Sequence, residues 1–247
     1  MKNLTLKEDG LSFELNTVDF TASLISSPKA KGEIFIPRKI LYEDQEYVIK
    51  SIKNGSFKGN DKIRIIKFAE DSEITSLGDE TFAVSSLISI EIPQQVTHLT
   101  KYLFNNCKYL KTVTIPQNSL IKTIDSYSFS FSQIESLTFS EHIEKLEEGW
   151  CMKTEKLNKI IISPSNKNFS YLDKEHKLIA GKSNLNQADF DVLVFACRDV
   201  KTVSIPPNIK YIGDYAFYEC KSLQEINFEG DSQLISIGKN AFNHSTL

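Results

Sequence analysis

The sequence predicts an elongated, mainly β solenoid built from repeats of 23 or 24 residues. An apolar triplet with the spacing i, i+3, i+5 recurs along the chain, and its last two members alternate with a polar residue, as in a strand. A unit this short cannot bury its own apolar face, so neighbouring units must stack and share a core. The triplets are Ile63-Ile66-Phe68, Leu87-Ile90-Ile92, Leu110-Val113-Ile115, Ile134-Leu137-Phe139, Leu157-Ile160-Ile162, Val200-Val203-Ile205 and Leu223-Ile226-Phe228.

A second apolar group follows each triplet and ends in an aromatic position. This recurring position explains why the chain has 16 Phe but only one Trp. We expect a short helical or 3-10 turn to carry each ring into the core, so that the rings form one column. Cys151 takes the aromatic position in one repeat. The column consists of Phe57, Phe82, Phe104, Phe129, Phe217 and Phe242.

The first 33 residues do not follow the repeat and are expected to form an N-terminal β-hairpin cap. Alternating apolar residues flank Asp9-Gly10, a dipeptide that favours a hairpin turn. The segment DFTASLIS reads as a further strand. A solenoid needs such a cap to cover the apolar end of its first repeat. Residues 34–247 are expected to form the solenoid as one elongated domain, with the segment LYEDQEY as a loop that lengthens the first repeat.

The repeats resemble those of the BspA-like leucine-rich repeat family. Segments such as SIPPNIKYIGDYAFYECKSLQEINF are similar to its consensus, roughly C-x-x-L-x-x-I-x-I-P-x-x-V-x-x-I-G-x-x-A-F. The resemblance covers about residues 34 to 247 and implies a right-handed leucine-rich repeat array. Between residues 163 and 198 one repeat does not show the triplet pattern. It is similar to a hairpin variant of BspA-like arrays in which a short link such as KEH joins two extended strands.

The resemblance implies a non-enzymatic, adhesin-like binding protein at the cell surface or outside the cell. The family includes surface antigens of mucosal protozoan parasites and bacteria. The implied partners are protein or glycan ligands on host cells, matrix or other microbes. The start of the chain carries charges where a signal peptide needs an apolar run. An intracellular scaffold for protein–protein interaction in the cytoplasm is therefore the alternative.

Composition and motifs argue against several other classes. A net charge of −3 and a pI of about 5.9 disfavour nucleic acid or an anionic membrane as partner. No apolar run is long enough to insert into a membrane. Catalytic motifs such as GxSxG, HExxH and GxGxxG are absent, so we expect no catalytic residue, metal or cofactor. The four cysteines form no CxxC pair, and Cys107, Cys151 and Cys220 are expected to be buried thiols, whereas the surroundings of Cys197 stay open.

The outward-facing positions of the repeated strands are the candidate ligand-binding residues. In each triplet strand the residue between the last two apolar positions, and the residue two before it, must point away from the core. This pattern predicts a mainly hydroxyl-bearing strip on a rigid surface, although serine and threonine there also suit an exposed strand. The candidates are Ser89, Glu91, Thr112, Thr114, Ser136, Thr138, Lys159, Ile161, Thr202 and Ser204.

The last repeat has no evident cap, since only five residues follow Phe242. Its strand would leave backbone groups unpaired at an edge, which invites another strand. We therefore expect either an end-to-end dimer through residues 221–247 or continuation in a longer chain.

Overall fold

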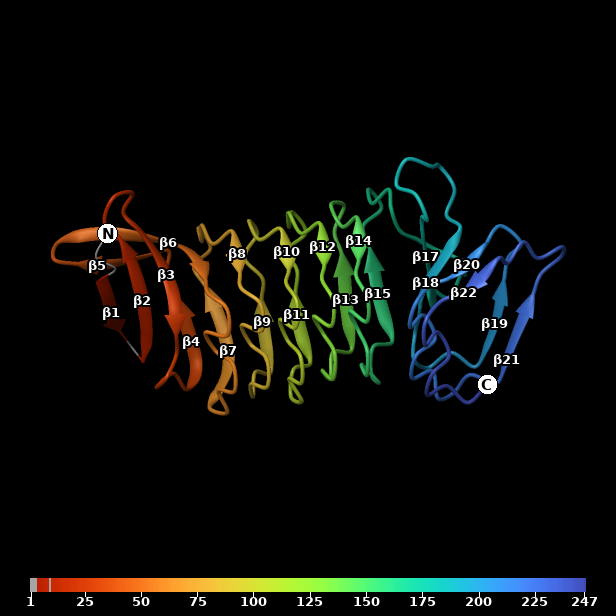
Figure 1. Cartoon of the computed structure of the whole chain (residues 1–247), viewed down its shortest axis with the longest axis horizontal. Coiled ribbons are helices and arrows are strands. Elements are labelled where there is room, and N and C mark those ends of the chain that lie inside the picture. Colours follow the sequence, from red (N-terminus) through yellow and green to blue (C-terminus); the bar gives the residue numbers. More distant parts are fainter. Residues whose placement is uncertain (1–3, 9) are drawn as a thin grey trace.

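The computed structural model describes residues 4–8 and 10–247, which form the predicted elongated β solenoid (Figure 1). Two ladders of strands run along the array, one formed by the triplet strands and one by the shorter strands that follow them. The described residues contain 22 strands and no helix. The fold is therefore confirmed, except for the short helical turns.

Three antiparallel strands begin the array, β1 (Leu4–Glu8), β2 (Leu11–Asn16) and β3 (Thr21–Ser26). The turn between β1 and β2 includes Gly10 at a φ of +82°; Asp9, its expected partner, lies outside the described residues. Strand β3 then pairs in parallel with β6 (Gln45–Ile52), which places the N-terminal strands at the end of one ladder. The division at residue 33 stays a prediction.

The triplet ladder carries the outward-facing candidate residues. Its strands pair in parallel within three separate sheets, and within each sheet the register aligns equivalent triplet positions, such as Val113 with Ile90 and Ile160 with Leu137. The strands are β4 (Gly32–Ile36), β7 (Ile63–Phe68), β9 (Ser89–Glu91), β11 (Thr112–Thr114), β13 (Ser136–Phe139), β15 (Lys159–Ile162), β19 (Thr202–Ile205) and β21 (Glu225–Phe228).

The second ladder consists of shorter strands whose apolar residues close the core from the other side. Its members include β6 and a series of two-residue strands, with β18 as a longer member of the same ladder. The strands after β6 are β8 (Ser76–Leu77), β10 (His98–Leu99), β12 (Thr123–Ile124), β14 (Lys145–Leu146), β18 (Val192–Ala196), β20 (Tyr211–Ile212) and β22 (Ser236–Ile237).

The aromatic column is present as predicted in its first four members. The ring centroids of Phe57, Phe82, Phe104 and Phe129 lie 5.4 Å apart at each step, and the rings are stacked. Each of these side chains is at most 1% exposed. The spacing is close to the separation of neighbouring strands, so every new strand of the ladder adds one buried ring.

The turns that carry these rings are not helical, and the expected helical or 3-10 turn is wrong. Each turn contains two residues with left-handed backbone four positions apart, such as Glu80 and Val84 at φ values of 56° and 60°. Left-handed residues cannot continue a right-handed helix. The same pair recurs at Tyr102 and Asn106. The turn is held instead by the next repeat, as where the amide of Phe82 donates to the carbonyl of Leu103 at 3.0 Å.

The segment LYEDQEY is a hairpin and not the expected loop. Strand β5 (Lys39–Tyr42) pairs antiparallel with β6, and Glu43 and Asp44 form the two-residue turn. Both turn residues have left-handed backbone, with φ values of 49° and 61°. This is the geometry that matches the twist of a two-residue hairpin.

The array is interrupted between β15 and β19. Here β16 (Ser170–Tyr171) and β17 (Leu178–Gly181) form an antiparallel hairpin, and β17 also pairs antiparallel with β18. The link between β16 and β17 contains the KEH segment noted in the sequence. Among the described residues β19 pairs with β21 alone, so the triplet ladder stops at β15 and begins again at β19.

A buried arginine fills the core at this interruption. Cys151 leaves space in the aromatic column, and the Arg198 guanidinium enters it, with Nη2 3.2 Å from the Cys151 sulfur. The guanidinium also lies 4.6 Å from the centre of the Phe195 ring. Its Nη1 donates to the carbonyls of Ala196 and Ala216 at 3.2 and 3.3 Å. Arg198 thus joins the hairpin repeat to the repeat that follows it.

Replacing Phe104 with alanine should lower the free energy of unfolding by about 3–5 kcal/mol, because a fully buried ring between two stacked rings is lost. The exposed Thr114→Ala variant should change it by less than about 0.5 kcal/mol. Urea unfolding of both variants beside the wild type measures the difference. Equal losses would contradict the assignment of the column.

The Cys151→Phe variant should be destabilised by about 1–3 kcal/mol, because the restored ring would collide with the Arg198 guanidinium. Combining it with Arg198→Ala should cost less than the sum of the two single changes, with a coupling of about 1 kcal/mol or more. Denaturant unfolding of the four proteins in this double-mutant cycle measures the coupling. Additive effects would show that the two side chains do not share the space.

The four cysteines should not react with a thiol-specific disulfide reagent near pH 8 while the protein is folded. All four thiols are free and buried, and burial raises the pKa of Cys107 and Cys151 to about 11 and that of Cys197 to about 12. All four should react after unfolding in guanidinium chloride. A rapid reaction of any thiol in the folded protein would contradict this.

The same shifts predict how stability changes with pH. Between about pH 8.5, where a thiol of the unfolded chain ionises, and about pH 11, the native thiols keep their protons. The native state then binds more protons than the unfolded state, so stability should fall as the pH rises through this range. Urea midpoints measured at several alkaline pH values, with Cys107→Ala as the comparison, test this contribution.

Candidate functional site

Eight of the ten candidate residues lie together on one face of the triplet ladder. The register places Thr112 beside Ser89 and Thr114 beside Glu91. It likewise places Ser136 beside Lys159. Parallel strands hold these side chains at a fixed spacing without any side-chain contact of their own. We call this set the strand-face strip; it consists of Ser89, Glu91, Thr112, Thr114, Ser136, Thr138, Lys159 and Ile161.

The strand-face strip is accessible to a partner. Six of its eight residues are exposed, and Ser89 and Thr138 are half-buried. Ile161 is 43% exposed, which makes it a large apolar side chain in a mainly hydroxyl-bearing surface. Further towards the N-terminus the same ladder exposes Phe35, 59% accessible. Hydroxyl groups around a few apolar side chains suit a polar protein or carbohydrate surface.

The structure separates the other two candidates from the strip. Thr202 and Ser204 are exposed on β19, beyond the hairpin that interrupts the ladder. Their neighbours in register are Glu225 and Asn227 of β21, and not residues of β15. The ten predicted residues therefore form two surfaces instead of one continuous strip.

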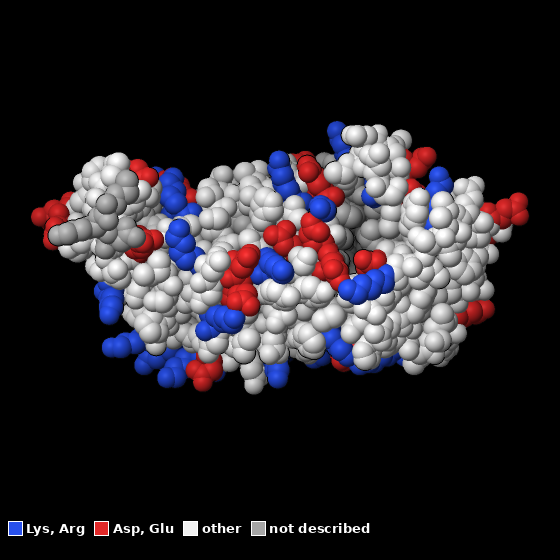
Figure 2. Space-filling model, viewed as in Figure 1, with Lys and Arg blue, Asp and Glu red and all other residues white. Residues whose placement is uncertain are grey.

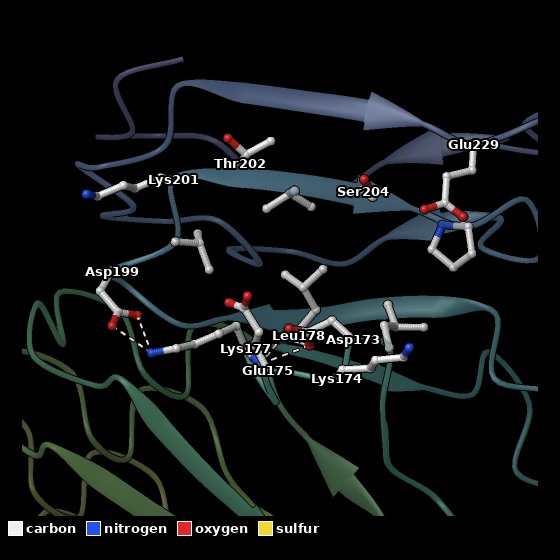
Figure 3. A pocket seen from close by; sticks show the side chains of 14 residues that line it. Asp173, Lys174, Glu175, Lys177, Leu178, Asp199, Lys201, Thr202, Ser204 and Glu229 are labelled. Carbon is white, nitrogen blue, oxygen red and sulfur yellow. Dashed lines mark hydrogen bonds and ion pairs between the residues drawn. The ribbon is translucent and has the colours of Figure 1, made fainter.

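A groove lies where the interruption leaves β19 without a neighbouring strand (Figure 3). It has a volume of about 740 Å³, within the range of about 300–1,000 Å³ found for ligand pockets. One wall is the link of the hairpin, residues 172–178, and the other is residues 199–206. Glu229 adds a carboxylate at the far end (Figure 3).

The groove has an apolar floor between charged rims. The buried side chains of Leu178, Val200 and Val203 line it. At one end of the groove the Lys177 ammonium of one wall contacts the Asp199 carboxylate of the other wall at 2.6 Å (Figure 3). Burial lowers the pKa of Lys177, but the hydrogen bond and the charge of Asp199 outweigh it, and the pKa is raised. This lysine therefore stays charged and paired.

Four other charged residues of the groove have no ion-pair partner among the described residues. Lys174 and Glu175 lie on the hairpin link, and the remaining two flank β19. These two are Lys201 at the start of β19 and Glu229 beyond its end (Figure 3). By contrast, Asp173 accepts hydrogen bonds from the backbone amides of Lys177 and Leu178 at 2.9 and 2.8 Å, which hold the hairpin link in shape. Lys201 and Glu229 are thus the unpaired charges beside β19, and Lys174 and Glu175 are those of the facing hairpin link.

The titratable groups in the described part of the chain include no candidate metal site, and a buried carboxylate among them is paired with lysines. No group of three or more His, Cys, Asp or Glu side chains is placed there to hold a metal ion. The buried Glu219 carboxylate pairs with Lys153 at 2.5 Å and Lys221 at 2.9 Å. Burial raises the pKa of Glu219, but these two lysines outweigh it and lower the pKa. This cluster is explained by charge pairing in the core.

Charges on the face shown in Figure 2 do not form one large field of a single sign. Acidic and basic side chains lie next to one another across its middle. Ion pairs among the described residues include Glu148–Lys239 at 2.7 Å and Lys58–Glu80 at 2.6 Å. Within the described residues no helix is long and apolar enough to cross a membrane.

The groove is not among the sites predicted from the sequence, although two of its lining residues, Thr202 and Ser204, are among the candidates. Its two walls, residues 172–178 and 199–206, belong to different repeats, and local periodicity says nothing of the space between them. The one available signal was the interval of 43 residues between triplets, which marks where the ladder is broken. The exposed Phe35 was also missed, although GEIFIP alternates in the same way as the other strands.

Comparison with solved structures supports the fold. The pneumococcal vaccine antigen PcpA is similar with a TM-score of 0.80 and 17% identity, over 98% of this chain and 68% of that chain. A leucine-rich repeat protein from Bacteroides ovatus has a TM-score of 0.70 and 21% identity, over 98% and 57% of the two chains. A leucine-rich cell surface protein from Faecalibacterium prausnitzii gives 0.62 and 16%, over 98% and 74%. At these identities the likeness shows the fold alone.

The search of curated proteins gave no match. The family model described as the BspA type leucine-rich repeat region matches six copies, over residues 45–158 and 188–247. The unmatched residues 159–187 contain β16 and β17, the hairpin that interrupts the ladder. Because the matched repeats cover most of the chain and their strands stack as one solenoid, this protein belongs to the BspA-type leucine-rich repeat family.

Proposed function

We propose that this protein is a non-enzymatic, adhesin-like binding protein that presents the strand-face strip to a protein or glycan ligand on host cells, matrix or other microbes. The observation that carries the proposal is the register of two strand pairs, β9 with β11 and β13 with β15, each of which fixes four of the eight side chains on the outward face. Repeat proteins of this kind generally bind other proteins through such extended surfaces. A rigid face loses little conformational entropy when a ligand binds.

We also propose that the protein lies at the cell surface. Two of the similar structures are a cell surface protein and a vaccine antigen. The four free cysteines favour the alternative, an intracellular scaffold that uses the same strip, because unpaired thiols are usual in a reducing compartment. Biotinylation of intact cells, with a cytosolic protein as control, separates the two. Labelling only after lysis would reject the surface location.

Adding negative charge to the strip should weaken binding without unfolding the protein. The double variant Thr112→Glu with Ser136→Glu places two carboxylates on neighbouring strands of the exposed face. Binding to a panel of immobilised extracellular-matrix proteins and mucin glycans should fall about tenfold or more, because unmatched charges must then be desolvated. The circular dichroism spectrum should not change.

The matched control is Ser76→Glu with Gln117→Glu, which adds the same charge at exposed positions outside the strip. This control should bind as the wild type does. If both double variants lost binding to the same extent, the loss would come from the added net charge, and the strip would be rejected as the site. Failure of the wild type to bind any member of the panel would reject the adhesin-like role.

A further inference from the structure

Strand β19 has a backbone edge that no other strand uses. The carbonyls of Lys201 and Ile205 accept hydrogen bonds from the amides of Gln224 and Glu229, at 2.7 and 3.0 Å. In a parallel pair, alternate residues direct their amide and carbonyl groups to opposite sides of the strand. Thr202 and Ser204 therefore direct theirs away from β21, towards the groove. Among the described residues no strand receives them.

On the other side of the interruption, the backbone edge of β15 is closed by the side chain of Tyr171. The Tyr171 hydroxyl accepts a hydrogen bond from the amide of Ile162 at 2.9 Å and donates one to the carbonyl of Ile160 at 3.0 Å. Both groups belong to β15, the last strand before the break. One edge of the gap is thus satisfied by the protein itself, and the other edge is open.

The groove beside the open edge has the dimensions and lining for one extended chain. Strand β19 has four residues, so a partner strand of four to six residues would pair along its whole length. Alternate side chains of such a partner would face Leu178, Val200 and Val203 on the floor, and the others would face solvent. These requirements describe a peptide that alternates apolar and polar residues.

The unpaired charges define the ends of that peptide. Lys201 lies at the start of β19 and Glu229 beyond its end (Figure 3). Lys177 and Asp199 neutralise each other, so these two residues are the free charges that flank β19. A peptide with an acidic residue near Lys201 and a basic residue near Glu229 is complementary to the groove. If it runs parallel to β19, as the other strands of this ladder do, the acidic residue comes first.

We propose that the groove between residues 172–178 and β19 binds an extended peptide segment of a partner protein, which adds a parallel strand to the open edge of β19. The segment alternates apolar and polar residues and carries an acidic residue before a basic one. Strand addition gives affinity through backbone hydrogen bonds, and the floor and the end charges give specificity. This site is separate from the strand-face strip and does not depend on it.

The test uses blocked heptapeptides and the whole chain. The probes are acetylated and amidated EVTVTVK and its charge-reversed counterpart KVTVTVE, each titrated into the protein by isothermal titration calorimetry. We expect EVTVTVK to bind below about 1 mM and more tightly than KVTVTVE. The Lys201→Glu variant should abolish this preference. No detectable binding of either peptide at about 1 mM would overturn the proposal.

The backbone pairing is tested by Ser204→Pro, which removes one amide of the open edge and leaves the bonds to β21. Proline is tolerated on a strand edge whose amide faces away from the sheet. Affinity for EVTVTVK should fall about tenfold, while Ser204→Ala, which keeps the amide, should bind as the wild type does. The matched control is Phe228→Pro, which removes an outward amide of β21 and should leave binding unchanged.

An N-methylated peptide and a strip variant test the proposal further. If Ser204→Pro does not fold, EVTVTVK with N-methyl groups on alternate residues replaces it, and equal binding of this peptide would exclude strand addition. The strip variant Thr112→Glu with Ser136→Glu should bind EVTVTVK with wild-type affinity. Loss of peptide binding in that variant would overturn the separation of the two sites.

Discussion

The burial of one repeat's apolar face by the next repeat is the interaction on which the structure depends. A turn of 23 or 24 residues is too small to enclose a core, so its triplet and its aromatic ring are shielded only by its neighbours. The 5.4 Å steps of the phenylalanine column show this constraint directly, because the rings advance with the strands. The packing of the core therefore sets the register of the strands, and the register sets which side chains lie together on the outward face.

The interruption shows what happens when one repeat departs from this rule. The hairpin repeat supplies no ring to the column, and Cys151 leaves room beside it. The core is completed by Arg198, whose charge is accommodated by carbonyls and by the face of Phe195. At the surface the break is bridged by Glu148, which accepts hydrogen bonds from Tyr127 and Lys239, residues on either side of it. The hydrophobic core itself continues through the break, where Trp150 packs against Phe139 and Phe195 with ring centres 6.0 and 5.7 Å apart.

The sequence allowed the repeats and the column to be predicted because the same constraint recurs at every turn. Phe104 and Ile90 face the same surroundings as their counterparts, so periodicity alone reveals them. The left-handed turn residues were hidden because most are not glycine; Val84, at a φ of 60°, is a residue type that seldom adopts this backbone. Arg198 was hidden for a different reason, since its partners lie in three separate repeats.

The strand-face strip and the groove differ in the same way. The strip could be predicted because it is the outward face of the periodic strands, whereas the groove could not, because it exists only where the period fails. The two surfaces also offer different chemistry. Within the paired part of the ladder the backbone groups are used by neighbouring strands, so a ligand meets side chains alone. At the break, Tyr171 closes the edge of β15 and leaves that of β19 open, so that the backbone itself becomes available for recognition.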